Sequence, residues 1–365
     1  MYKKILLDAP NVGALEKSYL NSAIDKGYVS TVGPFVSEFE KNFAKYLGAN
    51  RAVSTQSGTT AIHIALRELG IGAGDEVIVP ALTFVATVNP VIYVGATPVF
   101  VDVDPDTWNI DPHKVRKHIT RRTKAIIPVH LYGNPCNISQ IMGIAKKYGV
   151  YVVEDAAASL GAKFKKRHTG TFGDFGCFSF NGNKTITTGG GGMIVGKRTR
   201  VLEHIKFLAN QAKDESGKYY HREIGFNERM TNIEAALGLA QLKRLDGFLE
   251  KKRTFNRIYR EELKSIKSIR FQEEYPNAES AYWLSCITYE GNIPRLQLGL
   301  RKRDIVTRRV FTPVKDFPPY RKYRQGTCAN SQEIHNKGLC LPSSTLNSQA
   351  DIHYICDVIR KVIKR

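Results

Sequence analysis

The most constraining feature of this sequence is an alternation of apolar runs and amphipathic segments between about residues 50 and 200. Short apolar runs that read as strands lie within residues 72–81, 97–104, 124–130 and 150–156. Segments with apolar residues at helical spacing lie before and between them, at 59–69, 83–95, 110–119 and 138–149. Continuous apolar strands separated by helices are typical of a mostly parallel sheet that is covered on both faces. The expected fold class is therefore α/β.

The pattern changes in the C-terminal third of the chain. Residues 232–265 have the pattern of a long helix with a break near Asp246 and Gly247. Beyond it, short strands such as 281–290 are followed by a final helix at 351–365, which is an α+β pattern. We therefore place a boundary near residue 245. It separates a large domain with an N-terminal arm, residues 1–245, from a small C-terminal α+β domain, residues 246–365.

The chain carries 54 Lys and Arg against 34 Asp and Glu, a formal net charge of +20. Such an excess favours an anionic partner, which could be nucleic acid, an anionic membrane surface or a small phosphorylated substrate. No zinc finger, RNP-like motif or basic heptad repeat accompanies the charge. A solvated basic surface accounts for most of it, and we expect no nucleic-acid partner.

The chain has neither a secretory signal nor a membrane span in its pattern. Its N-terminal apolar run covers only residues 5–7, and no run approaches the about 18 apolar residues that a span requires. The six cysteines are scattered without a C-x-x-C pair or metal-like spacing. We expect a cytoplasmic protein with buried thiols, no disulfide framework and no metal site.

Ser57-Gly58-Thr59 stands directly before the first helical segment of the alternation. Free backbone N–H groups and the helix dipole make such a position a natural phosphate seat. A serine at this position is also a common helix N-cap, so the motif alone leaves both interpretations open.

Glu154 and Asp155 end the apolar run 150–156. Ligands of open α/β sheets bind beyond the carboxyl ends of the strands, which makes Asp155 a candidate ligand contact. A strand-terminal aspartate is equally often a helix cap or a salt-bridge partner.

Lys184 lies between an aromatic-rich run and the four glycines Gly189–Gly192. Four successive glycines indicate special backbone angles or close approach of a ligand. In a Walker-type loop the lysine follows the glycines, whereas here it precedes them. Phe178 and Phe180 indicate a buried lysine with a lowered pKa, as Schiff-base chemistry requires. The alternative is a surface lysine beside a flexible loop.

Asn227 and Arg229 precede a strongly apolar helical segment within residues 225–242. Either side chain could cap that helix or form a salt bridge. Considered singly, none of these four clusters decides the function.

Together, the segments do resemble a known family. Residues 74–104, 124–133, 152–162, 173–196 and 225–242 resemble the DegT/DnrJ/EryC1/StrS family of sugar aminotransferases, as do 27–40 and 337–344 near the two ends. The resemblance implies the fold of aspartate aminotransferase (fold type I), pyridoxal phosphate (PLP) as cofactor, bound by the large domain, and a homodimer with active sites at the subunit interface. The run FNGNK, followed by TTGGGG, is similar to enzymes that aminate C4 of a UDP-linked 4-keto-6-deoxy-N-acetylhexosamine.

The resemblance also implies roles for individual residues. Lys184 would be the Schiff-base lysine and the base that moves a proton during transamination, and Asp155 the carboxylate that keeps the cofactor's pyridine nitrogen protonated. Phe84 would stack on the cofactor ring, and Arg229 would contact the donor carboxylate or the substrate. The remaining implied contacts are with the cofactor phosphate, and they are made by Gly58, Thr59, Ser179 and, from the partner subunit, Asn227.

This sequence departs from the family pattern at two positions. Ala158 stands where many members have Gln, His or Glu, so a contact with the cofactor's ring oxygen is lost or is replaced by Ser159. Gly190 stands where many members have a glutamate. Relatives that dehydrate sugars have histidine in place of the Schiff-base lysine, so Lys184 favours transamination over deoxygenation.

The sequence therefore predicts a PLP-dependent nucleotide-sugar transaminase. An amino acid, glutamate by resemblance, would give its amino group to a nucleotide-linked 4-keto-6-deoxy sugar used for surface polysaccharide, such as lipopolysaccharide, or for another glycan. Lys and Arg of both subunits near residues 308–324 are candidates to bind the sugar's pyrophosphate. The alternatives are amination of a 3-keto-sugar or a keto-inositol, and a non-catalytic protein of this fold that binds sugar or nucleic acid.

Overall fold

The computed structural model describes residues 4–214, 220–323 and 326–364. Its central element is a seven-stranded sheet in the order β1-β9-β8-β5-β4-β2-β3. Strand β9 runs antiparallel to β1 and β8, and the other neighbouring pairs are parallel. The mostly parallel α/β sheet predicted from the sequence is confirmed. The strand bounds are Arg51–Thr55 (β1), Glu76–Pro80 (β2), Thr97–Val101 (β3), Thr123–Ile126 (β4), Tyr151–Asp155 (β5), Phe175–Ser179 (β8) and Gly192–Gly196 (β9).

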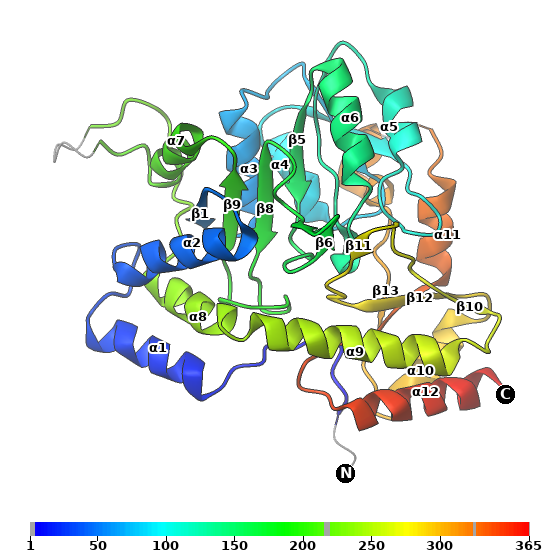
Figure 1. The fold of residues 1–365 in the computed structure, drawn as a ribbon. Coiled ribbons are helices and arrows are strands. Elements are labelled where there is room, and N and C mark those ends of the chain that lie inside the picture. Colours follow the sequence, from blue (N-terminus) through cyan, green and yellow to red (C-terminus); the bar gives the residue numbers. More distant parts are fainter. Residues whose placement is uncertain (1–3, 215–219, 324–325, 365) are drawn as a thin grey trace.

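Helices cover both faces of this sheet (Figure 1). In β2, Val77 and Val79 pack in the core on one face, and Ile78 packs in the core on the other. Successive strand residues point to opposite faces, which explains why the strands are continuously apolar. The helices of the first face are α3 (Gly58–Glu68), α4 (Asn89–Tyr93) and α7 (Thr199–Ala209). Those of the second are α2 (Pro34–Leu47), α5 (Pro112–His118), α6 (Ile138–Tyr148) and α8 (Asn232–Leu242), and α1 (Ala14–Asp25) packs on α8.

Two expected helices differ from the observed ones. The expectation of one helix over 83–95 is wrong, because the segment forms a 3-10 turn at Val85–Thr87 and then the short α4. Pro90 lacks the N–H group that a continuous helix would need there. The expected long helix over 232–265 is divided at Lys243 and Arg244, slightly before the expected break, and α9 (Leu245–Leu263) contains Gly247.

The C-terminal part contains a four-stranded antiparallel sheet in the order β10-β12-β14-β13. Helices α9, α10 (Ile293–Arg301) and α12 (Gln349–Ile363) share one apolar core with it. The predicted boundary between the large and the small domain at residue 245 stays a prediction. The strands are Ile269–Phe271 (β10), Ser285–Tyr289 (β12), Arg308–Arg309 (β13) and Gly338–Leu341 (β14), and α11 (Ala329–Lys337) precedes β14. A small third sheet joins β11 (Ala278–Glu279) to β6 (Lys163–Phe164) and β7 (Arg167–His168), and further 3-10 turns lie at Leu131–Gly133, Val314–Asp316 and Pro318–Tyr323.

The N-terminal residues lie against this C-terminal part. Ile5 forms a bridge with Ile305, and the Leu6 N–H donates to Asn347 Oδ1 at 3.1 Å. The Leu7 carbonyl accepts a hydrogen bond of 2.7 Å from the Ser343 N–H. Figure 1 shows the N-terminal segment passing beneath α9 toward α12.

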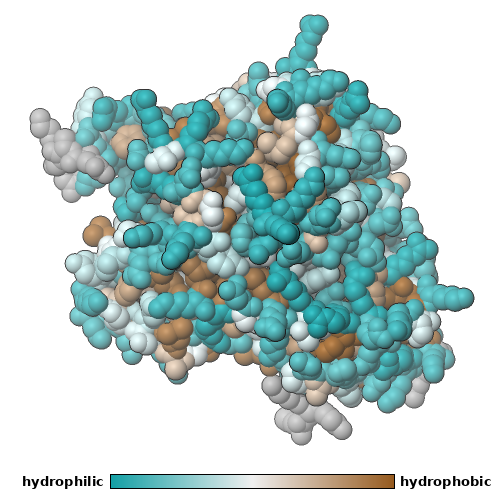
Figure 2. Space-filling view, viewed as in Figure 1, coloured by the Kyte–Doolittle hydropathy of each residue, from teal (hydrophilic) through white to brown (hydrophobic). Residues whose placement is uncertain are grey.

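Hydrophilic side chains cover most of the face shown in Figure 2, and hydrophobic ones form separate patches. All six cysteines are buried free thiols. No helix in the described residues is long and apolar enough to cross a membrane. In the part of the chain that the structure describes, no group of three or more His, Cys, Asp or Glu side chains is arranged so that it could hold a metal ion.

Candidate functional site

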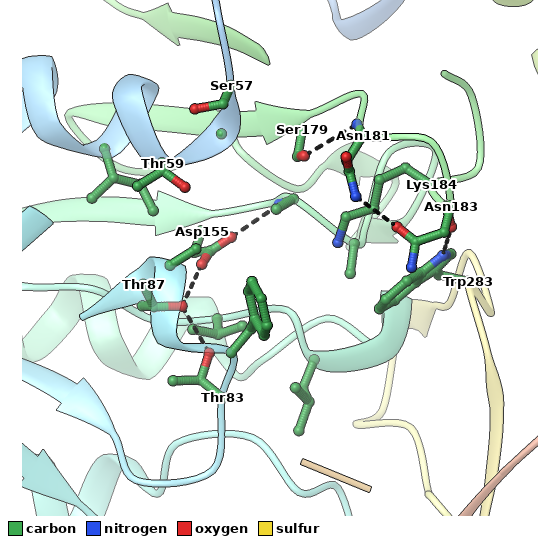
Figure 3. Close-up of a pocket in the computed structure, with 18 of the residues that line it drawn as sticks. Ser57, Thr59, Thr83, Thr87, Asp155, Ser179, Asn181, Asn183, Lys184 and Trp283 are labelled. Atoms are coloured by element: carbon green, nitrogen blue, oxygen red, sulfur yellow. Dashed lines mark hydrogen bonds between the residues drawn. The ribbon is translucent and has the colours of Figure 1, made fainter. Parts of the chain in front are cut away.

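A cavity of about 390 Å³ lies at the carboxyl ends of the parallel strands (Figure 3). Asp155 at the end of β5 and Ser179 at the end of β8 line it, as does Ser57, which follows β1. Trp283, just before β12, closes the opposite side together with residues from the C-terminal part. The cavity therefore occupies the position where open α/β sheets bind ligands.

The N-terminus of α3 forms one end of the cavity. Ser57 is its N-cap, and its hydroxyl accepts a hydrogen bond of 3.1 Å from the Thr60 N–H. A Cβ atom at Gly58 would lie 2.8 Å from Cβ of Ser179, so only glycine allows α3 to come this close to the end of β8. The first turn of a helix offers N–H groups and a positive dipole end, which together suit a phosphate.

Asp155 is held by a chain of buried hydroxyl groups. Thr87 Oγ1 donates to Asp155 Oδ2 at 2.6 Å, and the hydroxyls of Thr83 and Thr87 are 2.7 Å apart. The Ala157 N–H donates to the other carboxylate oxygen at 3.0 Å. Figure 3 shows this chain along the wall below Asp155. Hydrogen bonds of this kind stabilise a carboxylate and fix its orientation.

The Lys184 amine projects into the same cavity from the loop that follows β8. Burial lowers the pKa of Lys184 to about 8, although the negative charges of Asp155 and Asp8 oppose this shift. Its Nζ lies 4.0 Å from the centroid of the Trp283 ring. A lysine with a pKa near 8 is a usable nucleophile and base at neutral pH.

Behind Lys184 lies an arrangement that the sequence did not reveal. Trp283 Nε1 donates to the Asp8 carboxylate and, at 2.6 Å, to the Asn183 carbonyl. The buried Lys252 lies 3.3 Å from Asp8 Oδ1 and also donates to the carbonyl groups of Trp283 and Ser343. Burial raises the pKa of Asp8 to about 6, although Lys252 opposes this shift. Asp8 of the N-terminal segment thus holds the indole ring that covers Lys184 in place.

Glu154, the neighbour of Asp155, faces the core and not the cavity. Its carboxylate accepts hydrogen bonds from the backbone N–H groups of Gly170, Phe172 and Gly173, and His130 Nε2 lies 3.0 Å from it. It therefore anchors the loop before β8. Of the two adjacent acids, only Asp155 lines the cavity.

Most of the site residues predicted from the sequence line this cavity: Gly58, Thr59, Phe84, Asp155, Ser179 and Lys184. Asn227 and Arg229 do not. Asn227 is exposed, and its predicted contact would come from a partner subunit. The buried Nε of Arg229 has no hydrogen-bond partner among the described residues. The roles assigned to these two residues stay predictions.

The two departures from the family pattern also have structural consequences. Ala158 lines the cavity, whereas the Ser159 hydroxyl lies 2.9 Å from Thr169 Oγ1 and is buried away from it, so Ser159 does not replace the lost contact. A Cβ at Gly190 would lie 3.4 Å from Glu234 Oε1. A carboxylate therefore stands beside the position where many members carry a glutamate.

Comparisons with known proteins show which family the chain resembles in sequence and fold. The DegT/DnrJ/EryC1/StrS aminotransferase family matches residues 10–360. The chain is 40% identical over 362 residues to the GDP-perosamine synthase of Escherichia coli O157:H7, and the match covers 98% of each chain. The aminotransferase TlmJ from Streptoalloteichus hindustanus superposes with a TM-score of 0.94 at 27% identity, over 99% of both chains. Spr1654 of Streptococcus pneumoniae in its PLP-form gives a TM-score of 0.93 at 26% identity, again over 99% of both chains.

The fold is that of the fold type I aminotransferases, and the cofactor is PLP. The cavity fits this group in size, because pockets for small ligands measure about 300–1,000 Å³. The N-terminus of α3 with Gly58 and Ser179 would hold the phosphate, and Asp155 would face the ring nitrogen. Lys184 supplies the amine that would anchor the cofactor.

Proposed function

The chain belongs to the DegT/DnrJ/EryC1/StrS aminotransferase family, and we propose that it moves an amino group from glutamate to the C4 keto group of a nucleotide-linked 4-keto-6-deoxy sugar. The observation that carries this proposal is the convergence of Lys184 and Asp155 in one cavity beside the N-terminus of α3. A sugar- or nucleic-acid-binding protein without catalysis would not need a lysine of lowered pKa together with a buried carboxylate.

PLP, when bound, supplies an electron sink for the carbon that loses its proton. Asp155, fixed by Thr87 and by the Ala157 N–H, would keep the ring nitrogen protonated. Because the pKa of Lys184 is about 8, roughly a tenth of its amine is neutral at pH 7. Its Nζ would accept the proton from the donor carbon and return it when the sugar receives the amino group.

We propose a homodimer with shared active sites. Phe84 lines the cavity and is nevertheless 57% exposed, so the cavity wall at Phe84 is open to solvent in a single chain. A second subunit could cover this wall, and the family resemblance implies that its Asn227 would contact the cofactor phosphate.

The nucleotide that carries the sugar is a more detailed part of the proposal. The name of the Escherichia coli relative contains GDP, whereas the FNGNK segment resembles enzymes that act on UDP-linked sugars. Sugars linked to GDP and sugars linked to UDP should therefore both be tested as substrates. A role in making sugars for surface polysaccharide or another glycan is supported by the Bacillus subtilis relative named spore coat polysaccharide biosynthesis protein SpsC, which is 33% identical over 374 residues. We place this role in the cytoplasm.

The test is an absorbance spectrum of the purified protein before and after addition of glutamate, for wild type and Lys184→Ala. We expect a band of bound cofactor in the wild type that shifts with glutamate, and no such shift in the variant. GDP- and UDP-linked 4-keto-6-deoxy sugars are then added, and the position of the new amine is assigned by NMR. Identical spectra that glutamate does not change would refute the aminotransferase proposal. Amination of a nucleotide-linked 3-keto-6-deoxy sugar, but of neither 4-keto sugar, would refute the C4 assignment.

A further inference from the structure

The Trp283 ring forms the part of the cavity wall that faces the Lys184 amine. Lys184 Nζ lies 4.0 Å from the centroid of this ring, and Figure 3 shows the two side chains beside each other. The face of an aromatic ring attracts an ammonium group, and tryptophan has the strongest attraction of the aromatic side chains. The indole therefore favours the protonated form of Lys184.

Asp8 holds this ring and adds a negative charge behind it. Trp283 Nε1 donates a hydrogen bond to Asp8 Oδ2, and the side chain of Asp8 is buried. The other carboxylate oxygen of Asp8 lies 3.3 Å from Lys252 Nζ. An ion pair with Lys252 alone would be sufficient to anchor the N-terminal segment. The second oxygen instead orients the indole, so Asp8 reaches the cavity through Trp283.

The charges around Lys184 act in opposite directions. Burial lowers the pKa of Lys184 to about 8, while the negative charges of Asp155 and Asp8 raise it. The positive charge of Arg308, whose Cζ lies 5.7 Å from the Trp283 ring centroid, lowers it further. In the proposed function Asp155 pairs with the protonated ring nitrogen of the cofactor. Asp8 is then the negative charge that is left to balance a Lys184 ammonium group.

We propose that Asp8 and Trp283 form a seat for the Lys184 ammonium group, which holds the lysine and its proton in the cavity while its amine is not bonded to the cofactor. This inference rests on the proposed function, in which Lys184 accepts a proton from the donor carbon and later returns it. Lys184 is an ammonium group between these two transfers, and a fixed partner keeps it from losing the proton to water. Asp8 acts through Trp283, so it is a positioning residue.

The experiment measures how fast acetic anhydride acetylates Lys184 in cofactor-free protein at different pH values, with peptide mass spectrometry as the readout. Only the neutral amine reacts, so the midpoint of the curve reports the pKa of Lys184. Asp8→Asn keeps the size of the side chain and an acceptor oxygen for the indole but removes the charge. Because it also leaves Lys252 unbalanced, we expect the midpoint to fall by about one pH unit. At pH 7 the variant should be acetylated about fivefold faster than wild type, whereas above pH 9 the two rates should nearly agree.

Asn347→Ala is the matched control for the docking of the N-terminal segment. Asn347 accepts a hydrogen bond from the Leu6 N–H and donates one of 2.7 Å to the Leu6 carbonyl, and it has no charge. We expect this variant to unfold at a lower urea concentration but to keep the acetylation midpoint of wild type. An unchanged midpoint in Asp8→Asn, or an equal shift in Asn347→Ala, would overturn the inference.

Should Asp8→Asn fail to fold, Trp283→Phe decides the question by the same measurement. Phenylalanine keeps a ring but has no N–H group for Asp8 and a weaker attraction for a cation, so the midpoint should again fall. An unchanged midpoint in this variant would also overturn the inference. Addition of glutamate to PLP-loaded wild type separates the two levels of the argument. A wild type whose absorbance does not respond refutes the proposed function, whereas a responding wild type with unshifted variants refutes only the seat.

Discussion

Replacing Thr87 by valine is expected to weaken PLP binding about 10- to 100-fold without disturbing the fold. Thr87 is 1% exposed, and its hydroxyl donates to Asp155 Oδ2 at 2.6 Å. Valine has the same branched shape, so the change removes the hydroxyl and little else. A hydrogen bond to a charged group contributes about 1.5–3 kcal/mol, and 1.4 kcal/mol corresponds to about tenfold in affinity.

The assay is a titration of cofactor-free protein with PLP, followed by absorbance, together with urea unfolding of the same samples. Thr83→Val is the matched control, because Thr83 contacts the hydroxyl of Thr87 and has no hydrogen bond to Asp155. We expect its PLP affinity to change less than that of Thr87→Val. Equal affinities for wild type and Thr87→Val would show that the Thr87 hydroxyl does not support Asp155. An equal loss in Thr83→Val would show that the effect does not come from the direct hydrogen bond of Thr87 alone.

Two further predictions concern the phosphate seat and the lysine. Gly58→Ala should reduce PLP affinity in the same titration and destabilise the protein by about 1–3 kcal/mol, because its Cβ would lie 2.8 Å from Ser179 Cβ. Gly143→Ala in α6 meets no atom within 4 Å and should be neutral or stabilising, so an equal loss in both variants would contradict this account. Since only the neutral amine attacks, and the pKa of Lys184 is about 8, capture of PLP by cofactor-free protein should quicken about tenfold per pH unit below 8 and level off above it. Stopped-flow absorbance measures this rate, and a tenfold rise between pH 9 and 10 would be inconsistent with the lowered pKa.

The sequence could predict features that depend on neighbouring residues. The strands of the central sheet follow from their apolar runs, and Gly58 and Lys184 stand inside local motifs that form one end and one wall of the cavity. The helix expected over 83–95 failed because Pro90 interrupts an otherwise helical pattern. Periodicity reports which side chains are apolar, but it does not report whether the backbone can continue its hydrogen bonds.

Other features depend on contacts between distant segments. Trp283 donates to the carbonyl of Asn183, 100 positions away, and to Asp8, 275 positions away. No local pattern connects these residues, so neither Asp8 nor Trp283 was a candidate. Glu154 and Asp155 illustrate a different limit, because adjacent strand residues face opposite sides and the sequence does not say which acid faces the ligand.

The position of the N-terminal segment has a consequence for the order in which the protein becomes complete during translation. Residues near Asp8 leave the ribosome well before Trp283 and Asn347, which contact this segment. At about 5–20 residues per second, Asp8 waits roughly 14 to 55 s for Trp283, which follows it by 275 positions. The central sheet and the N-terminus of α3 can form in that interval, but the support behind Lys184 cannot. A nascent chain therefore acquires a complete cofactor pocket only after Trp283 has left the ribosome.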